Sequence, residues 1–153
     1  MAHRLIVAMQ PAIVTILILQ GPHAARSLSG ELFGHLQQLA RAAGRTLELC
    51  PCGGLRDLIA RVRAVKPQST EFMLLDPGDL TQQVRAHPEA GLCAALDGLA
   101  TPYIEVHDDS DDALESQDRS QRAPLATIII NGDLATSYQI ALGIALRQLG
   151  TSH

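Results

Sequence analysis

The sequence contains few aromatic residues: they make up 3% of its 153 residues, and none of them is tryptophan. A chain of this length suits one domain with a proper core, which must therefore be built from aliphatic side chains. Basic residues are also scarce: the net charge is −4, and no arginine-rich helix or basic patch stands out. We therefore do not expect nucleic acid as a partner.

Cysteine is rare as well, with three residues in the chain. An odd count argues against a disulfide scaffold and favours a reducing compartment, so we expect a cytoplasmic protein. Cys50 and Cys52 form a C-x-C without a second pair or a nearby histidine, which favours two small loop residues over a metal site. No apolar run reaches the roughly 18–20 residues of a membrane span, so a membrane is not an expected partner.

The motifs of several large enzyme classes are missing. The chain has no G-x-G-x-x-G, no Walker loop and no G-x-S-x-G elbow. Nucleotide binding and serine hydrolysis therefore lack the parts that they need. We expect no cofactor and no bound metal.

The chain does contain a regular alternation of apolar runs and helical patterns. Strands are predicted at 14–19, 47–50, 72–75, 103–107 and 126–130, and the first is a continuous β-branched run typical of a strand covered on both faces. Helical patterns lie between them. The alternation predicts an α/β protein, namely a single-domain, flavodoxin-like doubly wound five-stranded parallel sheet. The domain spans residues 1–153, with 1–12 as an N-terminal extension.

Apolar residues at helical spacing predict which helix faces are buried. The helix that Ser29 caps and Gly44 ends carries one such stripe, and the last helix, 134–149, carries another. The predicted stripes are Leu32, Leu36, Leu39 and Ala43 in the former and Ile140, Ile144 and Leu149 in the latter. A helical stretch after the third strand is predicted to break at Pro88.

The fourth strand ends in a candidate catalytic pair. Side chains alternate faces along a strand, so Ile104 and Val106 share one face, and Glu105 and His107 share the other. A carboxylate two residues before a histidine can hydrogen-bond the ring, fix its tautomer and raise its basicity. In an open parallel sheet this strand end is where ligands bind. A histidine that merely closes the strand end is the alternative.

An acidic segment follows at residues 108–112. It fits either a solvated loop or the edge of a pocket that favours a cation or a neutral polyol. A Ca²⁺ site there matches no EF-hand spacing.

Three strand ends carry recognisable motifs in order: Gly21-Pro22-His23, then Asp76-Pro77-Gly78, then Ile104-Glu105-Val106-His107. In order and position they resemble the type II 3-dehydroquinate dehydratases, whose strands end in G-P-N, N-P-G-A-L-T-H and I-E-V-H-x-S. Gly132 and Ser137-Tyr138 echo the last segment of that family. The resemblance covers nearly the whole chain from Thr15 onward.

The resemblance implies an anti elimination of water from 3-dehydroquinate. In that family a lid tyrosine removes a proton beside the ketone, an arginine lowers the pKa of the tyrosine, and an asparagine acts through water on the enolate. His107 then matches the general acid and Glu105 its orienting partner. Gly78 lies in the turn under the substrate, and Asp76, Gln82, Asp108, Asp109 and Arg26 are the remaining candidate substrate contacts.

The chain departs from the family in its lid. Only residues 23–28 separate Pro22 from the first helix, and they include no tyrosine. Arg26 is the one stand-in for the arginine, and His23 is the candidate replacement base. Asp76 stands where the family has asparagine, and Gln82 where it has histidine.

Three functions follow from these observations. The first is a dehydratase of 3-dehydroquinate that uses a replacement base. The second is a family member without activity that serves as a small-molecule-binding or assembly subunit. The third is a hydro-lyase or isomerase that acts on another substrate. The resemblance also implies a homo-oligomer built from trimers, up to a dodecamer.

Overall fold

The computed structural model describes residues 15–23, 28–109 and 124–150. One parallel sheet forms the middle layer, in the order β2-β1-β3-β4-β5. Its strands are β1 (Thr15–Gln20), β2 (Thr46–Pro51), β3 (Thr70–Asp76), β4 (Tyr103–His107) and β5 (Ala126–Ile129). This order confirms the predicted flavodoxin-like doubly wound fold. The predicted extension at 1–12 lies outside the described residues.

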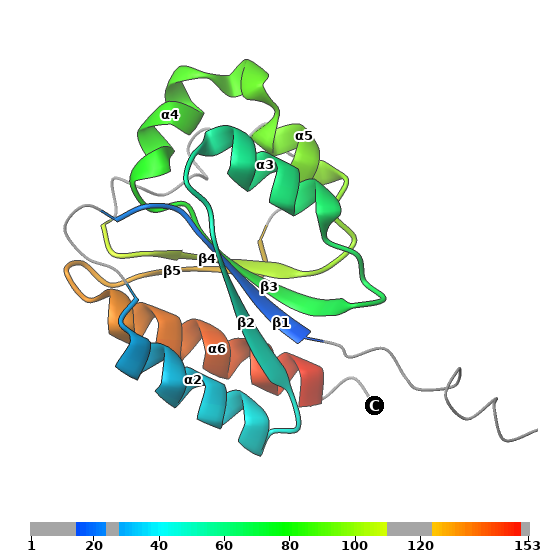
Figure 1. Cartoon of the computed structure of the whole chain (residues 1–153), viewed down its shortest axis with the longest axis vertical. Helices are drawn as coiled ribbons and strands as arrows, with labels where there is room; N and C mark the ends of the chain where they lie inside the picture. The colour runs from blue at the N-terminus through cyan, green and yellow to red at the C-terminus, as the bar shows by residue number, and fades with distance from the viewer. Residues whose placement is uncertain (1–14, 24–27, 110–123, 151–153) are drawn as a thin grey trace, which may run out of the picture.

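Helices cover both faces of the sheet (Figure 1). On one face lie α2 (Gly30–Ala42) and α6 (Leu134–Gly150), and on the other lie α3 (Leu55–Ala64), α4 (Thr81–Ala86) and α5 (Leu92–Asp97). Short 3-10 turns η1 (Gly78–Leu80) and η2 (Pro88–Ala90) flank α4, so the predicted break at Pro88 is confirmed. No helix in the described ranges is long and apolar enough to cross a membrane.

The core consists of two apolar layers, one on each face of the sheet. Ile16, Ile18 and Ile104 pack toward α2 and α6, whereas Leu19 and Met73 pack toward α3 and α5. The alternation follows from the period of two along each strand. Ile104 and Val106 belong to the same layer, as predicted. The side chains of Glu105 and His107 therefore point to the opposite face.

The two predicted helix stripes are partly wrong. In α2 the buried side chains are Leu36 and Ala40, and Leu39 is 41% exposed. Each residue turns a helix by about 100°, so a face centred between Leu36 and Ala40 leaves Leu39 at its edge. Ile140 in α6 is likewise 41% exposed, because the buried face of that helix runs through Tyr138 and Ala141.

Two glycines allow the loops after β1 and β3 to touch. The Gly21 amide donates to the Asp76 carbonyl at 2.7 Å, and the Asp79 amide donates to the Pro22 carbonyl at 2.7 Å. A methyl group on Gly21 would overlap the carbonyl oxygen of Pro77, and one on Gly78, whose φ is +59°, would overlap that of Pro22. This close approach positions the side chains at both strand ends.

Gly21→Ala should therefore lower the free energy of unfolding by about 2–4 kcal/mol, because the added methyl group separates the two loops. Gly34→Ala in α2 is the matched control, since nothing lies within 4 Å of its added methyl group. It should leave stability unchanged or raise it by up to about 1 kcal/mol, because alanine favours a helix over glycine. Urea denaturation of both variants measures the difference, and equal midpoints would contradict the steric argument.

Candidate functional site

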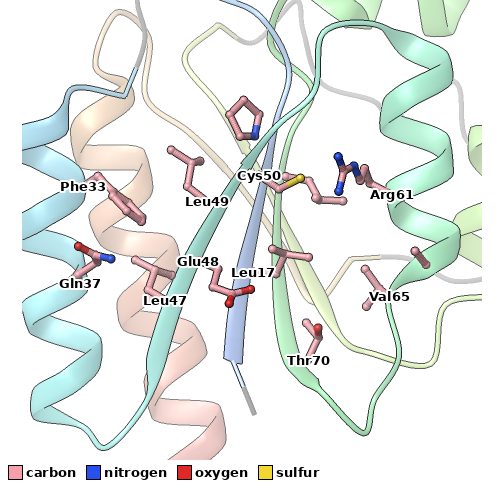
Figure 2. A pocket seen from close by; sticks show the side chains of 13 residues that line it. Leu17, Phe33, Gln37, Leu47, Glu48, Leu49, Cys50, Arg61, Val65 and Thr70 are labelled. Carbon is pink, nitrogen blue, oxygen red and sulfur yellow. The ribbon is translucent and has the colours of Figure 1, made fainter. Parts of the chain in front are cut away.

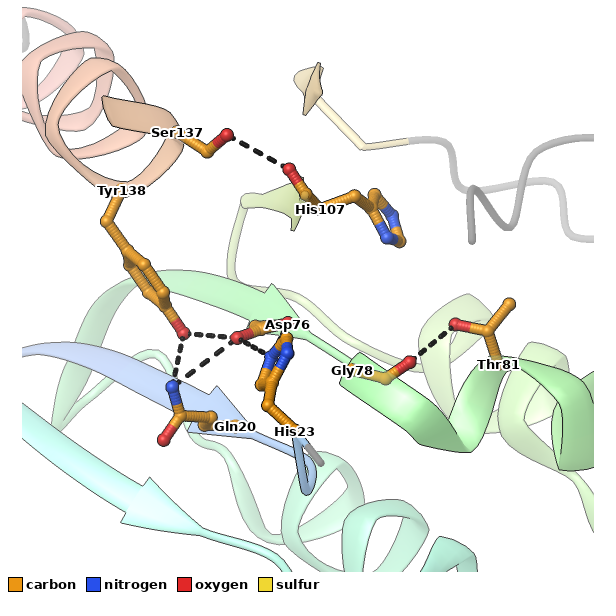
Figure 3. Close-up of polar contacts among 8 residues, drawn as sticks. All are labelled: Gln20, His23, Asp76, Gly78, Thr81, His107, Ser137 and Tyr138. Atoms are coloured by element: carbon orange, nitrogen blue, oxygen red, sulfur yellow. Dashed lines mark hydrogen bonds and ion pairs between the residues drawn. The ribbon is translucent and has the colours of Figure 1, made fainter. Parts of the chain in front are cut away.

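Three neighbouring strand ends bring the candidate residues together (Figure 3). His23 follows β1, Asp76 ends β3 and His107 ends β4. Gln20 is paired with Asp76 in the β1–β3 register, and Leu75 with Glu105 in the β3–β4 register. The motifs that the sequence placed at separate strand ends thus form one site at the carboxyl edge of the sheet, where open α/β sheets bind ligands.

Asp76 is the centre of a buried hydrogen-bond network and has no exposed surface. Its Oδ2 accepts from the hydroxyl of Tyr138 at 2.6 Å and lies 2.7 Å from His23 Nε2, which is also 2.9 Å from Oδ1. Gln20 Nε2 donates to the Tyr138 hydroxyl at 3.1 Å and reaches Oδ2 at 3.5 Å. The carboxylate is therefore held by side chains from β1, the loop after it and α6 (Figure 3).

His107 and Glu105 form a second buried pair. His107 Nε2 lies 2.8 Å from Glu105 Oε1, and both residues are at most 2% exposed. The predicted contact between carboxylate and ring is confirmed. Nδ1 of His107 is buried and has no hydrogen-bond partner among the described residues. Nδ1 is therefore the ring nitrogen that Glu105 does not bind.

Ser137 fixes the end of β4. Its hydroxyl donates to the His107 carbonyl at 2.9 Å and accepts from the Ile130 amide at 3.2 Å. These contacts tie the first turns of α6 to β4 and to the end of β5. Ser137 and Tyr138 thus hold both histidine–carboxylate pairs from the same helix.

The environment shifts two pKa values in the site. Burial lowers the pKa of His23, but its hydrogen bond to Asp76 and the charges of Asp76, Asp108 and Asp79 outweigh burial and raise the pKa above its ordinary 6.5. Burial, followed by the charge of Asp76 and the bond to it, raises the pKa of Tyr138 well above 10. Tyr138 is consequently a neutral hydrogen-bond donor at physiological pH.

The other predicted site residues occupy different surroundings. Gly78 lies under the His23 ring, whereas Gln82 is exposed on α4. Asp108 is half-buried and Asp109 exposed at the end of β4. Arg26 and most of the acidic segment lie outside the described residues. Their predicted roles in binding substrate stay predictions.

Asp76 does not lie where a substrate contact is expected. Its carboxylate is fully buried and contacts His23 and Tyr138. A buried carboxylate needs such donors, because leaving it unpaired would cost several kcal/mol. The imidazole of His23 therefore contacts the Asp76 carboxylate directly.

The chain is 30% identical over 151 residues to the 3-dehydroquinate dehydratase of Stutzerimonas stutzeri, an alignment that covers 90% of this chain and 99% of the relative. It belongs to the type II 3-dehydroquinate dehydratase family. The enzyme of the same name from Pseudomonas syringae pv. tomato is 31% identical over 150 residues and is covered to 97%.

A solved dehydratase-like protein supports the fold of this dehydroquinase-family chain. That protein, from Bifidobacterium longum, is described as 3-dehydroquinate dehydratase-like and superposes with a TM-score of 0.60 at 17% identity, covering 90% of this chain and 98% of its own. At this identity the likeness supports the fold alone. No family model matches the chain.

Two residues of the network received no role in the sequence analysis. Gln20 ends a continuous apolar strand, and a buried amide at that place is a signal for a polar site that the motif comparison passed over. Tyr138 was noted only as an echo of the family pattern. Its contact with Asp76 spans 62 positions of sequence, so no local pattern indicates it.

A cavity of about 670 Å³ lies elsewhere, around the edge strand β2 (Figure 2). Phe33 and Gln37 of α2 line one side, and Arg61 and Val65 line the other. None of the predicted site residues that the structure describes belongs to its lining. The candidate site is therefore the cluster at the strand ends rather than this cavity.

The raised pKa of His23 predicts a pH-dependent stability. The folded protein holds this proton more tightly than the unfolded chain, so the contribution is complete below pH 6.5 and is lost as the pH rises through the raised pKa. The difference in unfolding free energy between wild type and His23→Asn should therefore shrink on going from pH 6 to alkaline pH. Urea denaturation across that range measures it.

His35→Asn is the matched control, because His35 is exposed on α2 and outside the site. Its difference from wild type should change little over the same range. A His23→Asn difference that grows with pH would contradict the assigned contact with Asp76.

Proposed function

We propose that this protein is a hydro-lyase of the dehydroquinase type, in which His23 acts as the base and His107 as the acid. The observation that carries the proposal is the placement of two buried histidine–carboxylate pairs, His23–Asp76 and Glu105–His107, at neighbouring strand ends of a chain from this family. Elimination of water needs one group that takes a proton and one that gives a proton.

The base must differ from the lid tyrosine of the family. The chain has two tyrosines. Tyr103 is buried at the amino end of β4, away from the strand ends that carry the site. Tyr138 is held protonated by burial and by Asp76, which raise its pKa. Neither side chain can serve as a tyrosinate.

His23 has the chemistry of a general base. When Nε2 donates its proton to Asp76, the lone pair resides on Nδ1. The Asp76 carboxylate orients the ring and stabilises the imidazolium that forms after proton transfer, as carboxylates do in other histidine–carboxylate pairs. Asp76 thus takes the part of an orienting group, and Glu105 has the same part toward His107.

The proposed reaction balances in protons and electrons. His23 Nδ1 removes the proton on the carbon beside the ketone of 3-dehydroquinate, and the electron pair of that C–H bond moves toward the ketone oxygen. The electrons then return to form the C=C bond while the C–O bond of the leaving hydroxyl breaks. In this step His107 must start as an imidazolium, with its Nε2–H directed at Glu105, and it donates its Nδ1 proton to that oxygen. Water departs, and solvent then takes the proton from His23 and returns one to His107.

We also propose the surroundings of this reaction. Gly78, Gln82, Asp108, Asp109 and Arg26 are the proposed substrate contacts. The protein is proposed to act in the cytoplasm as a homo-oligomer built from trimers, up to a dodecamer, without nucleic acid, membrane, cofactor or metal as a partner. Sedimentation velocity distinguishes a monomer of 16.4 kDa from such assemblies.

A second function, a small-molecule-binding or assembly subunit without turnover, is favoured by the missing lid tyrosine and by a base whose pKa is raised. A third, a hydro-lyase or isomerase for another substrate, is favoured by the His23–Asp76 pair, which stands where the family has two asparagines.

Calorimetric titration with 3-dehydroquinate separates these two functions. Binding without turnover supports the second function, and the absence of both binding and turnover supports the third.

Purified protein should convert 3-dehydroquinate to 3-dehydroshikimate, followed by the ultraviolet absorbance of the product. His107→Ala and His23→Asn should each lower kcat by about 10²–10⁴-fold, because each removes one proton-transfer group. His35→Asn, an exposed histidine substitution, should leave kcat unchanged. No turnover by the wild-type protein at high concentration would refute the proposed activity.

The pH profile adds a second test of the roles. A base with a raised pKa predicts that kcat/KM rises with pH through the pKa of His23. Asp76→Asn removes the partner that raises this pKa, so the rising limb should move to lower pH while the maximal rate falls. A limb unchanged by this substitution would assign the base to another group.

A further inference from the structure

Tyr138 makes a contact that the proposed reaction does not use. Its ring lies in the buried face of α6, and its hydroxyl reaches Asp76 at the end of β3 (Figure 3). The distance of 2.6 Å is at the short end for a hydroxyl that donates to a carboxylate. Both residues have no exposed surface, so water does not compete for the bond.

Gln20 determines the direction of this hydrogen bond. Its amide nitrogen donates to the Tyr138 oxygen at 3.1 Å, which occupies a lone pair and leaves the single hydroxyl proton for Asp76. Asp76 Oδ2 thus accepts a hydrogen bond from the Tyr138 hydroxyl, while His23 Nε2 lies within 2.9 Å of both carboxylate oxygens. The carboxylate has little freedom to rotate, and it presents both oxygens to one nitrogen of the imidazole.

We propose that Tyr138 is a positioning residue for His23: its hydroxyl, oriented by Gln20, holds the Asp76 carboxylate so that the ring is bound through Nε2 and Nδ1 carries the lone pair. The catalytic meaning of this arrangement rests on the proposed function, in which His23 is the base. The arrangement itself does not rest on the proposed function, because it concerns only the tautomer and the titration of His23.

The hydroxyl also moderates the charge that His23 experiences. The charged groups that act on the ring are Asp76 from β3, which contacts it, and Asp79 from η1 and Asp108 after β4, all of them acidic. A hydrogen bond from Tyr138 draws negative charge on Asp76 away from the imidazole. Removing it should make the carboxylate a stronger acceptor for His23, and the imidazolium form should become more stable.

The test is an NMR titration of the histidine ring nitrogens in full-length wild-type protein, Tyr138→Phe, Asp76→Asn and Tyr103→Phe. Tyr138→Phe should raise the pKa of His23 by about half a unit to one unit, the size of one hydrogen bond. Asp76→Asn should lower it. The neutral ring should be the Nε2–H form in wild type.

Tyr103→Phe is the matched control, because it also removes the hydroxyl of a buried tyrosine, at the other end of the sheet. It should leave the titration and tautomer of His23 unchanged. Equal titration curves in wild type and Tyr138→Phe would overturn the proposal, as would an equal shift in Tyr103→Phe.

Kinetics separate this inference from the proposed function. If the wild type turns over 3-dehydroquinate, Tyr138→Phe should lower kcat about tenfold with little change in KM, and the rising limb of the pH profile should move to higher pH by the shift that NMR measures. A changed His23 titration in a protein without turnover would support the positioning role and refute the activity. Turnover that depends on His23 with an unchanged titration would do the reverse.

Discussion

The buried carboxylate of Asp76 is the constraint on which the site depends. A charge without exposed surface is tolerated only where donors replace its water, and here they come from β1, from the loop after β1 and from α6. Asp76 therefore bonds side chains that lie up to 62 positions from it in the sequence. The loops after β1 and β3 must touch for this to happen, which explains why Gly21 and Gly78 stand at their point of contact.

The hydrogen-bond network around Asp76 gives this site a different charge distribution from the one that the family resemblance implies. Where the resemblance implies two neutral amides, His23 and Asp76 form a pair that can exchange and hold a proton. A second pair, Glu105 and His107, lies on the next strand end. Each histidine is bound through Nε2 by a carboxylate, so both rings have Nδ1 left over. One sheet edge thus holds two histidines that present the same ring nitrogen.

The helix α6 links both pairs. Ser137 bonds the backbone at His107, and the next residue, Tyr138, bonds Asp76. Successive residues of a helix point about 100° apart, so one helix can reach two strand ends at once. The position of this helix against β3 and β4 therefore decides the geometry of both histidines, and a shift of the helix would affect the two pairs together.

Local patterns were sufficient for much of the fold. The continuous apolar runs predicted five parallel strands, and the period of two placed Glu105 beside His107, a contact that spans two residues. Helix faces were harder: Leu39 and Ile140 follow the helical spacing but are exposed, because apolar composition does not say how far a helix is rotated against its sheet. The three motif ends meet in the structure because the carboxyl ends of parallel strands share an edge.

The sequence by itself thus determined the sheet, the order of its motifs, the family and the Glu105–His107 pair, since each follows from local periodicity or from residues in order along the chain. Only the tertiary structure decided that Asp76 is hidden from ligands and held by Tyr138 and Gln20. These contacts join residues whose separation in sequence is 56 to 118 positions. A hydrogen bond over that distance depends on how α6 packs on the sheet, which no local pattern encodes.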